Sequence, residues 1–487
     1  MLSEWRRKLI VAAMMRNSDI SAVALDLGTT SIKAALMDAD GNLCHVTRQD
    51  APTINHHNGY YESDGLAYLT TTEQVLKQCL SHTHKKPPLG LCSQRSSFLI
   101  WEKNSGDPAI PLISWQDTRG SECCNRLYAS TELIQRLTGL RLTPYYFAPK
   151  LNVLLRENPS WRDKLIQKQW LVGTLDTFLI WRWTRGQHYW VDASMAARTL
   201  LMDIHQQQWS QNLCELFGIP LEILPDIRSS TELNITFESF DLTLTASMAD
   251  QSAAYLASVD GNLANVSDKA LVNLGTGGFV IRTFPQEPSV LNGYLQTLVY
   301  QPADELPCFA IEGTLNSIAA VLAPYSIEDC VIEDMASSNI FCLAEPSGLG
   351  APYFRQEYGL FFSQSTSLLT QQQIVVLLLE AICFRIARII EDFHSQLPLA
   401  EIYLSGGLSA LPCLQHGIGQ CVSLPIYYLQ QKEASLQGAA LLAVNSKVHC
   451  PQEVSRISVV QKSDKLNKKF LAWKEWLDDL LLEEIKN

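Results

Sequence analysis

The sequence predicts an α/β protein built from two related halves, and two short segments carry this prediction. Residues 25–30 read LDLGTT and residues 273–278 read NLGTGG, and apolar stretches flank each segment. Both patterns are typical of a strand, a tight turn and a second strand. Glycine lets backbone N–H groups approach an anion closely, and threonine adds a hydroxyl donor. We therefore expect a duplicated domain that holds phosphate between its halves.

Length and composition agree with this prediction. A chain of 487 residues is too long for one core, and about two or three domains are expected. Hydrophobic residues make up 47% and charged residues 18%, which is ordinary for a globular enzyme. The net charge of −12 argues against a nucleic-acid surface and against an anionic membrane partner. An anionic substrate would need local positive groups, such as Lys33 or Arg95.

Cysteine usage and the N-terminus predict the compartment. The 13 cysteines form no CxxC pair and no zinc-like cluster, so we expect free thiols in a reducing cytosol. No apolar run reaches the roughly 18 residues that a membrane span needs. The first 17 residues are a poor signal peptide, because their apolar stretch is short and Arg16 follows it directly. We expect a short helical extension or an upstream start codon, and a cytoplasmic protein.

In the first half, the hydrophobic pattern predicts strands at residues 21–26, 32–38 and 43–48, joined by a turn at 39–42. A helix follows at 65–79, and a short buried strand at 89–92 leads to the polar run that contains Arg95 and Ser96. Residues 97–101 and 113–117 continue the strand pattern. Helices are expected at 119–128, 133–137, 150–157 and 176–183.

In the second half, a helical run is expected at residues 252–257, directly after Asp250 and Gln251. The hairpin of the second glycine turn follows. A long amphipathic helix is predicted at 374–393, a strand at 401–404, and helices that begin at 408, 436 and 470. The boundary between the halves is expected near residues 243–246, and no Pro, Gly or Ser-rich linker marks it.

The motifs exclude several chemistries. No GxxxxGK[ST], no GxGxxG after a strand, no HExxH and no GxSxG occurs. What remains are two phosphate turns, Asp26 at the end of the first strand, and Asp250 at a helix start. Taken alone, Asp250 could be a helix N-cap and Asp26 a turn residue that binds local N–H groups. Phosphoryl transfer needs such a set: phosphate donors, a carboxylate that organises hydrated magnesium, and a carboxylate that accepts the acceptor's proton.

These residues resemble the FGGY family of carbohydrate kinases, which have the actin/hexokinase-like (ribonuclease H-like) fold, and within it the chain is most similar to the glycerol kinase branch. The resemblance covers roughly residues 23–473. It is carried by matching phrases at 25–31, 114–117, 138–140 with 144–145, 192–199 with 204–205, 216–220 with 223–225, 249–251, 275–277, 348–352 and 405–407. It implies two such domains flanking an ATP and substrate cleft: residues 1–19 as an extension, 20–244 as the N-terminal domain and 245–487 as the C-terminal domain.

The resemblance implies roles for the polar residues of both turns. Asp250 matches the catalytic base, and Asp26 matches the residue that positions Mg²⁺ through water, with Asp250 also near the metal. The ATP contacts match Thr29, Thr30, Lys33, Gly275, Thr276, Gly406 and Gly407. For the glycines, turn geometry alone is the alternative explanation. Lys33 stands where glycerol kinases have Arg, which keeps the charge but loses the bidentate fork.

The resemblance also implies an acceptor pocket. Polar contacts match Arg95, Tyr145, Asp250 and Gln251, and apolar walls match Trp115 and Phe279. Glycerol kinases have Glu after the matching Arg, whereas this chain has Ser96. Loss of an interaction with a charged partner is worth about 1.5–3 kcal/mol, or roughly tenfold to over a hundredfold in affinity. The pocket therefore has room for a larger polyol or ketose.

Three further departures lie at the nucleotide end. Ser405 stands where the family usually has Asp, and Ala249 replaces a Gly. Leu411 replaces a common Asn, and we interpret it as a packing residue.

The sequence thus predicts an ATP-dependent kinase that phosphorylates a primary hydroxyl of a small polyol, with glycerol first, and with ATP and Mg²⁺ bound. A tetritol, pentitol or ketose is the nearer alternative, and a degenerate sensor that binds nucleotide or sugar is the other. We expect a small polyol or sugar as partner, no nucleic acid, no membrane span, and a possible homodimer or tetramer.

Overall fold

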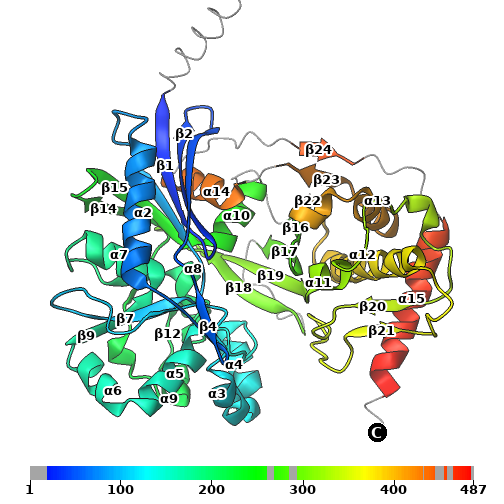
Figure 1. Ribbon diagram of the computed structural model, residues 1–487, viewed down its shortest axis with the longest axis horizontal. Coiled ribbons are helices and arrows are strands. Elements are labelled where there is room, and N and C mark those ends of the chain that lie inside the picture. Colours follow the sequence, from blue (N-terminus) through cyan, green and yellow to red (C-terminus); the bar gives the residue numbers. More distant parts are fainter. Residues whose placement is uncertain are drawn as a thin grey trace, which may run out of the picture. The chain divides into compact units, whose positions relative to one another are not determined.

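The computed structural model describes residues 19–259, 268–284, 293–430, 433–444, 454–457 and 464–483. The predicted N-terminal extension lies outside these residues, apart from its last position. The chain forms two compact units (Figure 1). Of the described residues, the first unit holds 19–259, 297–308 and 433–444, and the second holds 268–284, 293–296, 309–430, 454–457 and 464–483.

The first unit is built on a six-stranded mixed sheet with the order β14-β15-β6-β1-β2-β3. Its strands are β1 (Ile20–Leu27), β2 (Ser31–Asp38), β3 (Leu43–Asp50), β6 (Leu89–Ser93), β14 (Thr231–Phe237) and β15 (Leu242–Ala249). β1 pairs antiparallel with β2 and parallel with β6, and β15 pairs parallel with β6. The carboxyl ends of β1, β6 and β15 therefore lie at the same edge of the sheet, which is where parallel sheets place their ligand sites.

A second sheet of this unit has the order β4-β5-β8-β7-β9. Its strands are β4 (Asn55–His57), β5 (Tyr60–Ser63), β7 (Phe98–Glu102), β8 (Leu112–Ile113) and β9 (Trp170–Thr174). Shorter strands are β10 (Trp190–Asp192), β11 (Met202–Asp203), β12 (Gln208–Trp209) and β13 (Asp226–Arg228). The helices are α2 (Gly65–Leu80), α3 (Ser121–Arg126), α4 (Thr131–Thr138), α5 (Phe147–Glu157), α6 (Pro159–Ile166), α7 (Leu175–Trp183), α8 (Ala193–Ala196), α9 (Gln211–Phe217), α10 (Asp250–Ser258) and α14 (Ala434–Ala443), with 3-10 turns η2 (Tyr128–Ser130) and η3 (Leu221–Ile223).

The alternation of side chains along β1 explains how helices cover the main sheet. Val23 and Leu25 belong to a core cluster with α2 and α7, whereas Ala22 and Ala24 belong to a cluster with α14. Successive side chains of a strand point to opposite faces, so one face carries large residues and the other small ones. The small face lets α14 pack closely on the sheet, and Asp26 lies on this same face by its position in the alternation.

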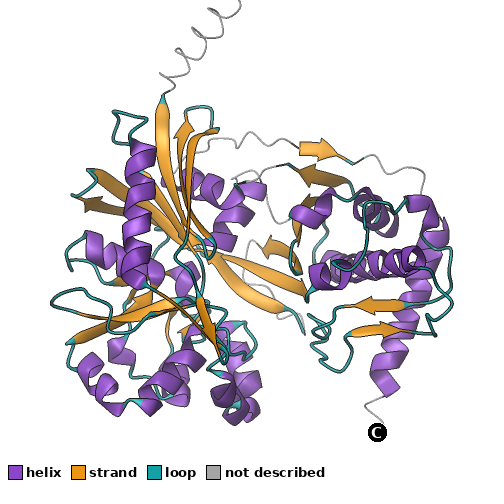
Figure 2. Cartoon of the chain, in the orientation of Figure 1, coloured by secondary structure: helices purple, strands orange, loops and turns teal. Residues whose placement is uncertain are grey.

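The second unit is built on a mixed sheet that contains the order β19-β17-β16-β22-β23-β24, seen as orange arrows in Figure 2. The strands are β16 (Lys269–Leu274), β17 (Gly278–Phe284), β19 (Cys308–Leu315), β22 (Glu401–Ser405), β23 (Ile426–Leu429) and β24 (Val454–Arg456). β18 (Leu295–Tyr300) begins in this unit, and β20 (Cys342–Ala344) and β21 (Leu360–Phe362) form a separate pair. The helices are α11 (Ile318–Leu322), α12 (Gln371–Gln396), α13 (Pro412–Cys421) and α15 (Asp464–Glu483), with 3-10 turns η5 (Ile332–Asp334) and η6 (Gly407–Ala410).

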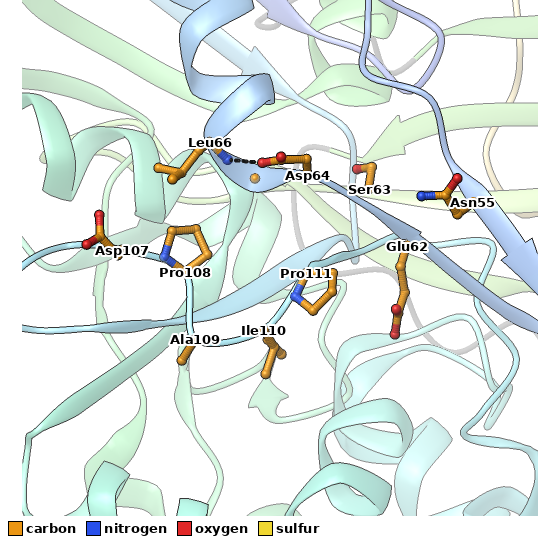
Figure 3. Close-up of a pocket in the computed structure, with 11 residues that line it drawn as sticks. Asn55, Glu62, Ser63, Asp64, Leu66, Asp107, Pro108, Ala109, Ile110 and Pro111 are labelled. Atoms are coloured by element: carbon orange, nitrogen blue, oxygen red, sulfur yellow. Dashed lines mark hydrogen bonds between the residues drawn. The ribbon is translucent and has the colours of Figure 1, made fainter.

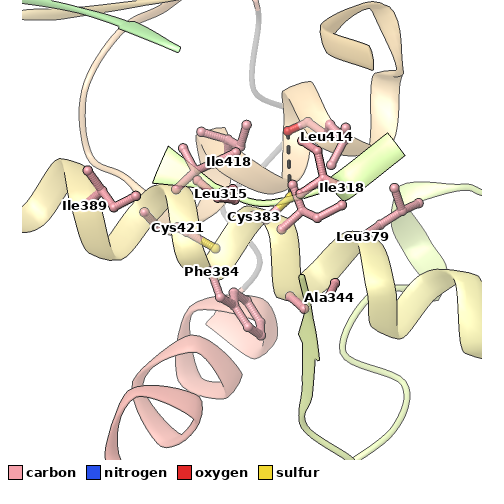
Figure 4. Packing of buried hydrophobic residues seen from close by; sticks show 14 of the residues in the cluster. Leu315, Ile318, Ala344, Leu379, Cys383, Phe384, Ile389, Leu414, Ile418 and Cys421 are labelled. Atoms are coloured by element: carbon pink, nitrogen blue, oxygen red, sulfur yellow. Dashed lines mark hydrogen bonds between the residues drawn. The ribbon is translucent and has the colours of Figure 1, made fainter. Parts of the chain in front are cut away.

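The long helix α12 is the centre of the core of the second unit. Leu379, Cys383, Phe384 and Ile389 of this helix are buried among side chains of β19, β20 and α13 (Figure 4). Thr370 is the N-cap of α12 and forms a capping box with Gln373. The Thr370 side chain accepts the Gln373 N–H, and the Gln373 side chain accepts the Thr370 N–H.

The two units repeat one sheet topology. In the first, β3-β2-β1-β6-β15 follow one another, and in the second β19-β17-β16-β22-β23 do. In both sets the first three strands are antiparallel neighbours and the last three are parallel neighbours. The predicted duplicated α/β architecture is therefore confirmed.

Several details differ from the predictions. Residues 243–246, where the boundary between the halves was expected, lie inside β15, because this strand pairs with β6 and completes the first sheet. The compact units consequently do not follow the division at residue 245, and α10 and α14 belong to the first unit. The helix expected from residue 408 is instead the 3-10 turn η6 followed by α13, which begins at Pro412 because proline suits the first helical turn.

Candidate functional site

The first glycine turn lies between β1 and β2 and brings two charged residues together. Asp26 and Lys33 are cross-strand partners in the antiparallel register. The Lys33 Nζ also lies 2.5 Å from a carboxylate oxygen of Glu433, just before α14. Gly28 is required by the backbone, since a Cβ there would lie 2.6 Å from the carbonyl oxygen of Ser31. The turn therefore presents a carboxylate and a paired ammonium group at the sheet edge.

Asp26 is held in an environment that disfavours its charge. Burial raises the pKa of Asp26 to about 7, and the negative charge of Asp250 adds to this, while Lys33 opposes it. The side chain is only 9% exposed. A carboxyl group whose pKa is raised by a neighbouring carboxylate would be stabilised in its charged form by a cation at the same place.

Asp250 is the first residue of α10, and the motif at residues 192–199 fixes the backbone that leads to it. Asp192 caps α8 by accepting the N–H groups of Ser194 and Met195. The hydroxyl of Ser194 donates to Asp192 and in turn accepts the Ala249 N–H at 2.8 Å. The end of β15 is thereby fixed by hydrogen bonds one residue before Asp250.

The side chain of Asp250 is not a helix cap, because Ala249 occupies the N-cap position. Its carboxylate accepts the Gln251 N–H at 2.7 Å and lies 3.9 Å from the Arg95 guanidinium. Burial raises the pKa of Asp250, and the positive charge of Arg95, with a smaller contribution from Arg198, opposes that rise. Asp250 is thus a half-buried carboxylate with a guanidinium beside it, which is an arrangement suited to accepting a proton.

A cavity of about 470 Å³ in the first unit brings most of the predicted acceptor residues together. Its lining residues are Thr29, Gln94, Arg95, Ser96, Trp115, Thr143, Tyr145, Tyr146, Arg198, Asp250 and Gln251. Arg95 and Ser96 follow β6, Asp250 and Gln251 follow β15, and Thr29 follows β1. The shared edge of the parallel strands explains why residues so distant in sequence meet here.

A closed ring of hydrogen bonds holds Trp115 at the wall of this cavity. Its indole N–H donates to the Thr29 hydroxyl, which donates to the side-chain oxygen of Gln94. The Ser97 hydroxyl donates to the same Gln94 oxygen and accepts the backbone N–H of Trp115. The Trp115 and Tyr145 rings lie 6.5 Å apart between centroids, and both are substantially exposed. Together they offer aromatic surface to a ligand.

A buried lysine that the sequence analysis did not single out joins the loops of Ser96 and Trp115. The Nζ of Lys150, on α5, donates to the carbonyl oxygens of Ser96 and Ser114, each at 2.9 Å. Burial lowers the pKa of Lys150 to about 7, and the carboxylate of Asp117 opposes this shift. Lys150 therefore fixes the backbone that carries two pocket residues, without lining the pocket itself.

The sequence analysis also missed Arg198 as a pocket residue. Arg198 lies within the matching segment 192–199. A charged arginine among mostly apolar and small residues there could have indicated a site residue. The Arg198 guanidinium lies 5.6 Å from the centre of the Tyr146 ring, and its Nη1 donates to the Thr297 hydroxyl at 3.4 Å. The Ser96 hydroxyl donates to the Arg198 carbonyl oxygen.

The remaining predicted residues lie elsewhere. Thr30 lies in the first turn and Lys33 follows it on β2, and neither residue lines the cavity. In the second unit, Thr276 is exposed at the second turn, Gly407 is exposed in η6, and Phe279 is half-buried on β17. A Cβ on Gly406 would lie 2.5 Å from the Leu274 carbonyl oxygen, whereas Gly275 and Gly407 show no such close contact. Turn geometry therefore explains Gly406 but not Gly275 or Gly407. Leu411 packs against the hydrophobic core, as expected.

A second cavity of the first unit, about 440 Å³ in volume, contains none of the predicted site residues (Figure 3). Its three carboxylates have structural partners. Asp64 caps α2 through the Leu66 N–H, Glu62 pairs with Arg119, and Asp107 lies 3.9 Å from Arg182. The cavity that contains Asp250 is thus the better candidate site.

Comparison with known proteins identifies the family. Models of the N-terminal and C-terminal domains of the FGGY family of carbohydrate kinases match residues 21–240 and 270–446. A glycerol kinase of Acinetobacter baylyi is 30% identical over 446 residues, covering 86% of this chain and 89% of its own, and a glycerol kinase of Malacoplasma penetrans is 27% identical, covering 95% and 98%. The crystal structure of Plasmodium falciparum glycerol kinase with ADP matches with a TM-score of 0.82 at 24% identity, covering 94% of this chain and 98% of its own.

The chain belongs to the FGGY family of carbohydrate kinases. It is an ATP-dependent kinase that acts on a sugar or polyol. Within the described part of the chain, none of the helices combines the length and the apolar character that crossing a membrane requires.

Proposed function

We propose that this kinase transfers the γ-phosphoryl group of ATP to a primary hydroxyl of a small polyol, with glycerol as the first candidate. The name of the relatives from Acinetobacter baylyi and Malacoplasma penetrans supports glycerol. A tetritol, pentitol or ketose is the alternative, which the serine at position 96 supports, because its short side chain leaves space in the pocket.

The single observation that carries this proposal is the position of Asp250 in the pocket. Its carboxylate shares the cavity with Trp115 and Tyr145, which would cover the CH faces of an acceptor, and with Arg95 and Gln251, which would bind hydroxyl groups. In this role Asp250 accepts the proton of the attacking hydroxyl as the hydroxyl oxygen bonds to the γ-phosphorus and the bond from that phosphorus to the leaving ADP breaks. The positive charge of Arg95 favours the charged form of this carboxylate, and the fixed pocket supplies orientation.

The carboxylates of Asp26, at the first turn, and Asp250, at the start of α10, fit a magnesium ion. Asp26 and Asp250 are two carboxylates whose charges oppose each other, and a divalent cation would relieve that repulsion. Within the described residues no three metal-ligating side chains gather, so the remaining ligands would be water and phosphate oxygens. We propose that Asp26 would hold Mg²⁺ largely through water, with Asp250 nearby, and that the bound ion would neutralise phosphate charge.

For the nucleotide, we propose that Thr29, Thr30 and Lys33 in the first unit contact phosphate oxygens, and that Gly275 and Thr276 do so in the second. Gly406 and Gly407 are proposed to approach the adenosine. The open space around Gly407 supports a ligand contact at this position, since among the described residues no atom lies within 4 Å of where a Cβ would be. The homodimer or tetramer and the cytoplasmic location stay predictions.

The test is an ADP-release assay with Mg·ATP against glycerol, tetritols, pentitols and ketoses. We expect a rate above the ATP-only background with at least one acceptor, and loss of that rate in Asp250→Asn. A matched control is Asp107→Asn, because Asp107 lies at the other cavity of the same unit. Nucleotide binding without any acceptor-dependent rate would instead support the sensor alternative.

A further inference from the structure

The end of β15, just before Asp250, is bonded differently on its two sides. On one side, β6 pairs with β15 as far as Ala249. On the other side, the pairing with β14 ends earlier, at Ala246. The Ser247 N–H still donates to the Ser230 carbonyl oxygen at 2.9 Å. The N–H of Ala249 lies beyond the reach of β14 and needs another acceptor.

The side chain of Ser194, in α8, supplies that acceptor. Its hydroxyl accepts the Ala249 N–H at 2.8 Å and donates to a carboxylate oxygen of Asp192 at 3.0 Å. Ser194 and Ala249 are both buried. Without the hydroxyl, the Ala249 N–H would be a buried donor that has lost its acceptor, and a shift of the strand end would relieve this unfavourable state.

Asp192 fixes the direction of the Ser194 hydroxyl. Its carboxylate accepts the backbone N–H groups of Ser194 and Met195 and the hydroxyl groups of Ser194 and Ser230. Burial raises the pKa of Asp192 to about 6, and these hydrogen bonds oppose the rise. Asp192 is therefore largely charged at neutral pH, and a charged acceptor forms stronger hydrogen bonds. The proton of the Ser194 hydroxyl points to Asp192, which leaves its oxygen lone pairs for Ala249.

Resting on the proposed function, we propose that Ser194 is a positioning residue for catalysis: its bond to the Ala249 N–H holds the end of β15 where the Asp250 carboxylate can accept the proton of the acceptor hydroxyl. The Asp250 carboxylate accepts the Gln251 N–H at 2.7 Å, so its place follows the start of α10. Ser194 does not line the acceptor cavity and acts through Asp250. A misplacement of about 1 Å can lower a rate about a hundredfold.

Ser230 offers a matched control for Ser194. Each hydroxyl donates one hydrogen bond to Asp192. Each also accepts one backbone N–H, that of Ala249 in the case of Ser194 and that of Gln301 in the case of Ser230. Both serines are buried, with exposed fractions of 1% and 0%. Removal of either hydroxyl deletes the same kinds of bond, but only the Ser194 hydroxyl is bonded to the end of β15.

The experiment compares Ser194→Ala with Ser230→Ala in the ADP-release assay, with the acceptor that gives the wild type its highest rate. Ser194→Ala should lower kcat at least about tenfold, because the base is misplaced. Its KM for ATP should stay within about twofold, since uniform binding is retained. Ser230→Ala should lower the Tm by a similar amount and keep kcat within about twofold. Equal losses of kcat in the two variants, at equal losses of Tm, would overturn the proposal.

A second pair of variants and a second measurement apply if Ser194→Ala does not fold. Ser194→Cys and Ser230→Cys keep the approximate size of the side chain, but sulfur is a weak acceptor. We expect kcat to fall in Ser194→Cys and to stay near the wild-type value in Ser230→Cys. Amide hydrogen exchange of the peptide that contains Ala249 should be faster in Ser194→Cys than in Ser230→Cys. Equal kcat and equal exchange in this pair would overturn the proposal.

The positioning proposal and the proposed function fail in different ways. Wild-type turnover in Asp250→Asn would overturn the role of the base and the catalytic role of Ser194 together. If Asp250→Asn loses the rate and the Ser194 and Ser230 variants do not differ, only the positioning proposal fails. If no acceptor is phosphorylated by the wild type, the proposed function fails, and amide exchange then decides. Faster exchange at Ala249 in the Ser194 variants would support the hold on the strand end, and equal exchange would overturn it.

Discussion

The two glycine turns have the same strand topology and different chemistry. We call residues 26–30 the Asp turn and residues 273–277 the Asn turn. Both join an antiparallel pair whose first strand also pairs in parallel with a later strand. In the Asp turn, Asp26 is paired across the strands with Lys33, and in the Asn turn the matching Asn273 is paired with Phe279.

The difference shows how two copies of one fold can take different chemical roles. Both turns offer backbone N–H groups and a threonine hydroxyl, which suffice for phosphate. Only the Asp turn carries a buried carboxylate close enough to a second one, Asp250, for their charges to interact. The Asp turn thus carries an ionisable side chain, whereas the Asn turn carries none and is electrically neutral. The predictions below test this division, from the largest expected effect to the smallest.

The largest effect is expected for Asp250→Asn. General base catalysis contributes about 10²–10⁴-fold, so kcat should fall by roughly that factor. The KM for ATP should stay within about twofold, because the amide keeps the shape of the carboxylate. Steady-state kinetics with the best acceptor measure both values. Near-normal turnover would remove Asp250 from the role of base.

Exchanging the two turn residues is expected to have unequal effects. Asp26→Asn should lower kcat by about 100-fold, the size expected when one preorganised electrostatic contact is lost, and should raise the Mg²⁺ concentration needed for half-maximal rate. Asn273→Asp should raise the KM for ATP by about tenfold, or 1.4 kcal/mol, because a new carboxylate would repel phosphate. Equal losses in both variants would contradict the proposed division between the turns.

The pH dependence of stability should report the buried carboxylate of the Asp turn. Because the pKa of Asp26 is raised to about 7, the folded protein retains a proton that the unfolded chain releases near pH 4. This contribution to stability is fully present below about pH 4 and is lost as pH rises to about 7. In metal-free protein, the free energy of unfolding of Asp26→Asn should therefore rise relative to that of the wild type as pH increases. The difference should grow by roughly 2 kcal/mol from pH 5 to pH 8. Denaturant unfolding in EDTA measures this gain, and parallel pH profiles of the two proteins would argue against it.

The smallest effect separates structural from ligand-binding glycines. Gly28→Ala should lower the free energy of unfolding by about 1–3 kcal/mol, because the new Cβ would lie 2.6 Å from the Ser31 carbonyl oxygen. Gly275→Ala should leave the Tm unchanged, since its nearest neighbour would lie at 3.7 Å, and should raise the KM for ATP. Thermal melts and ATP titrations distinguish the two. A lowered Tm in Gly275→Ala would assign that glycine to turn geometry.

Much of the fold was accessible from the sequence because its signals are local. The period-two pattern around each glycine turn predicted the hairpins, and the helix predicted at residues 374–393 lies within α12. The boundary expected near residues 243–246 instead lies inside β15, and the sequence could not show this, because whether Leu242–Ala249 joins the first sheet depends on pairing with Leu89–Ser93, about 150 residues away. Such pairing leaves no local mark in the sequence.

The sequence by itself determined the family, the two turns and the identities of the carboxylates, because these depend on residue type and spacing. Only the tertiary structure decided that Asp26 and Asp250 interact, that Lys33 is paired with Glu433, and that Lys150 and Arg198 belong to the site or its support. The physical reason is burial: removal from water shifts the pKa values and makes charge balance matter, and burial is a property of the packed chain as a whole.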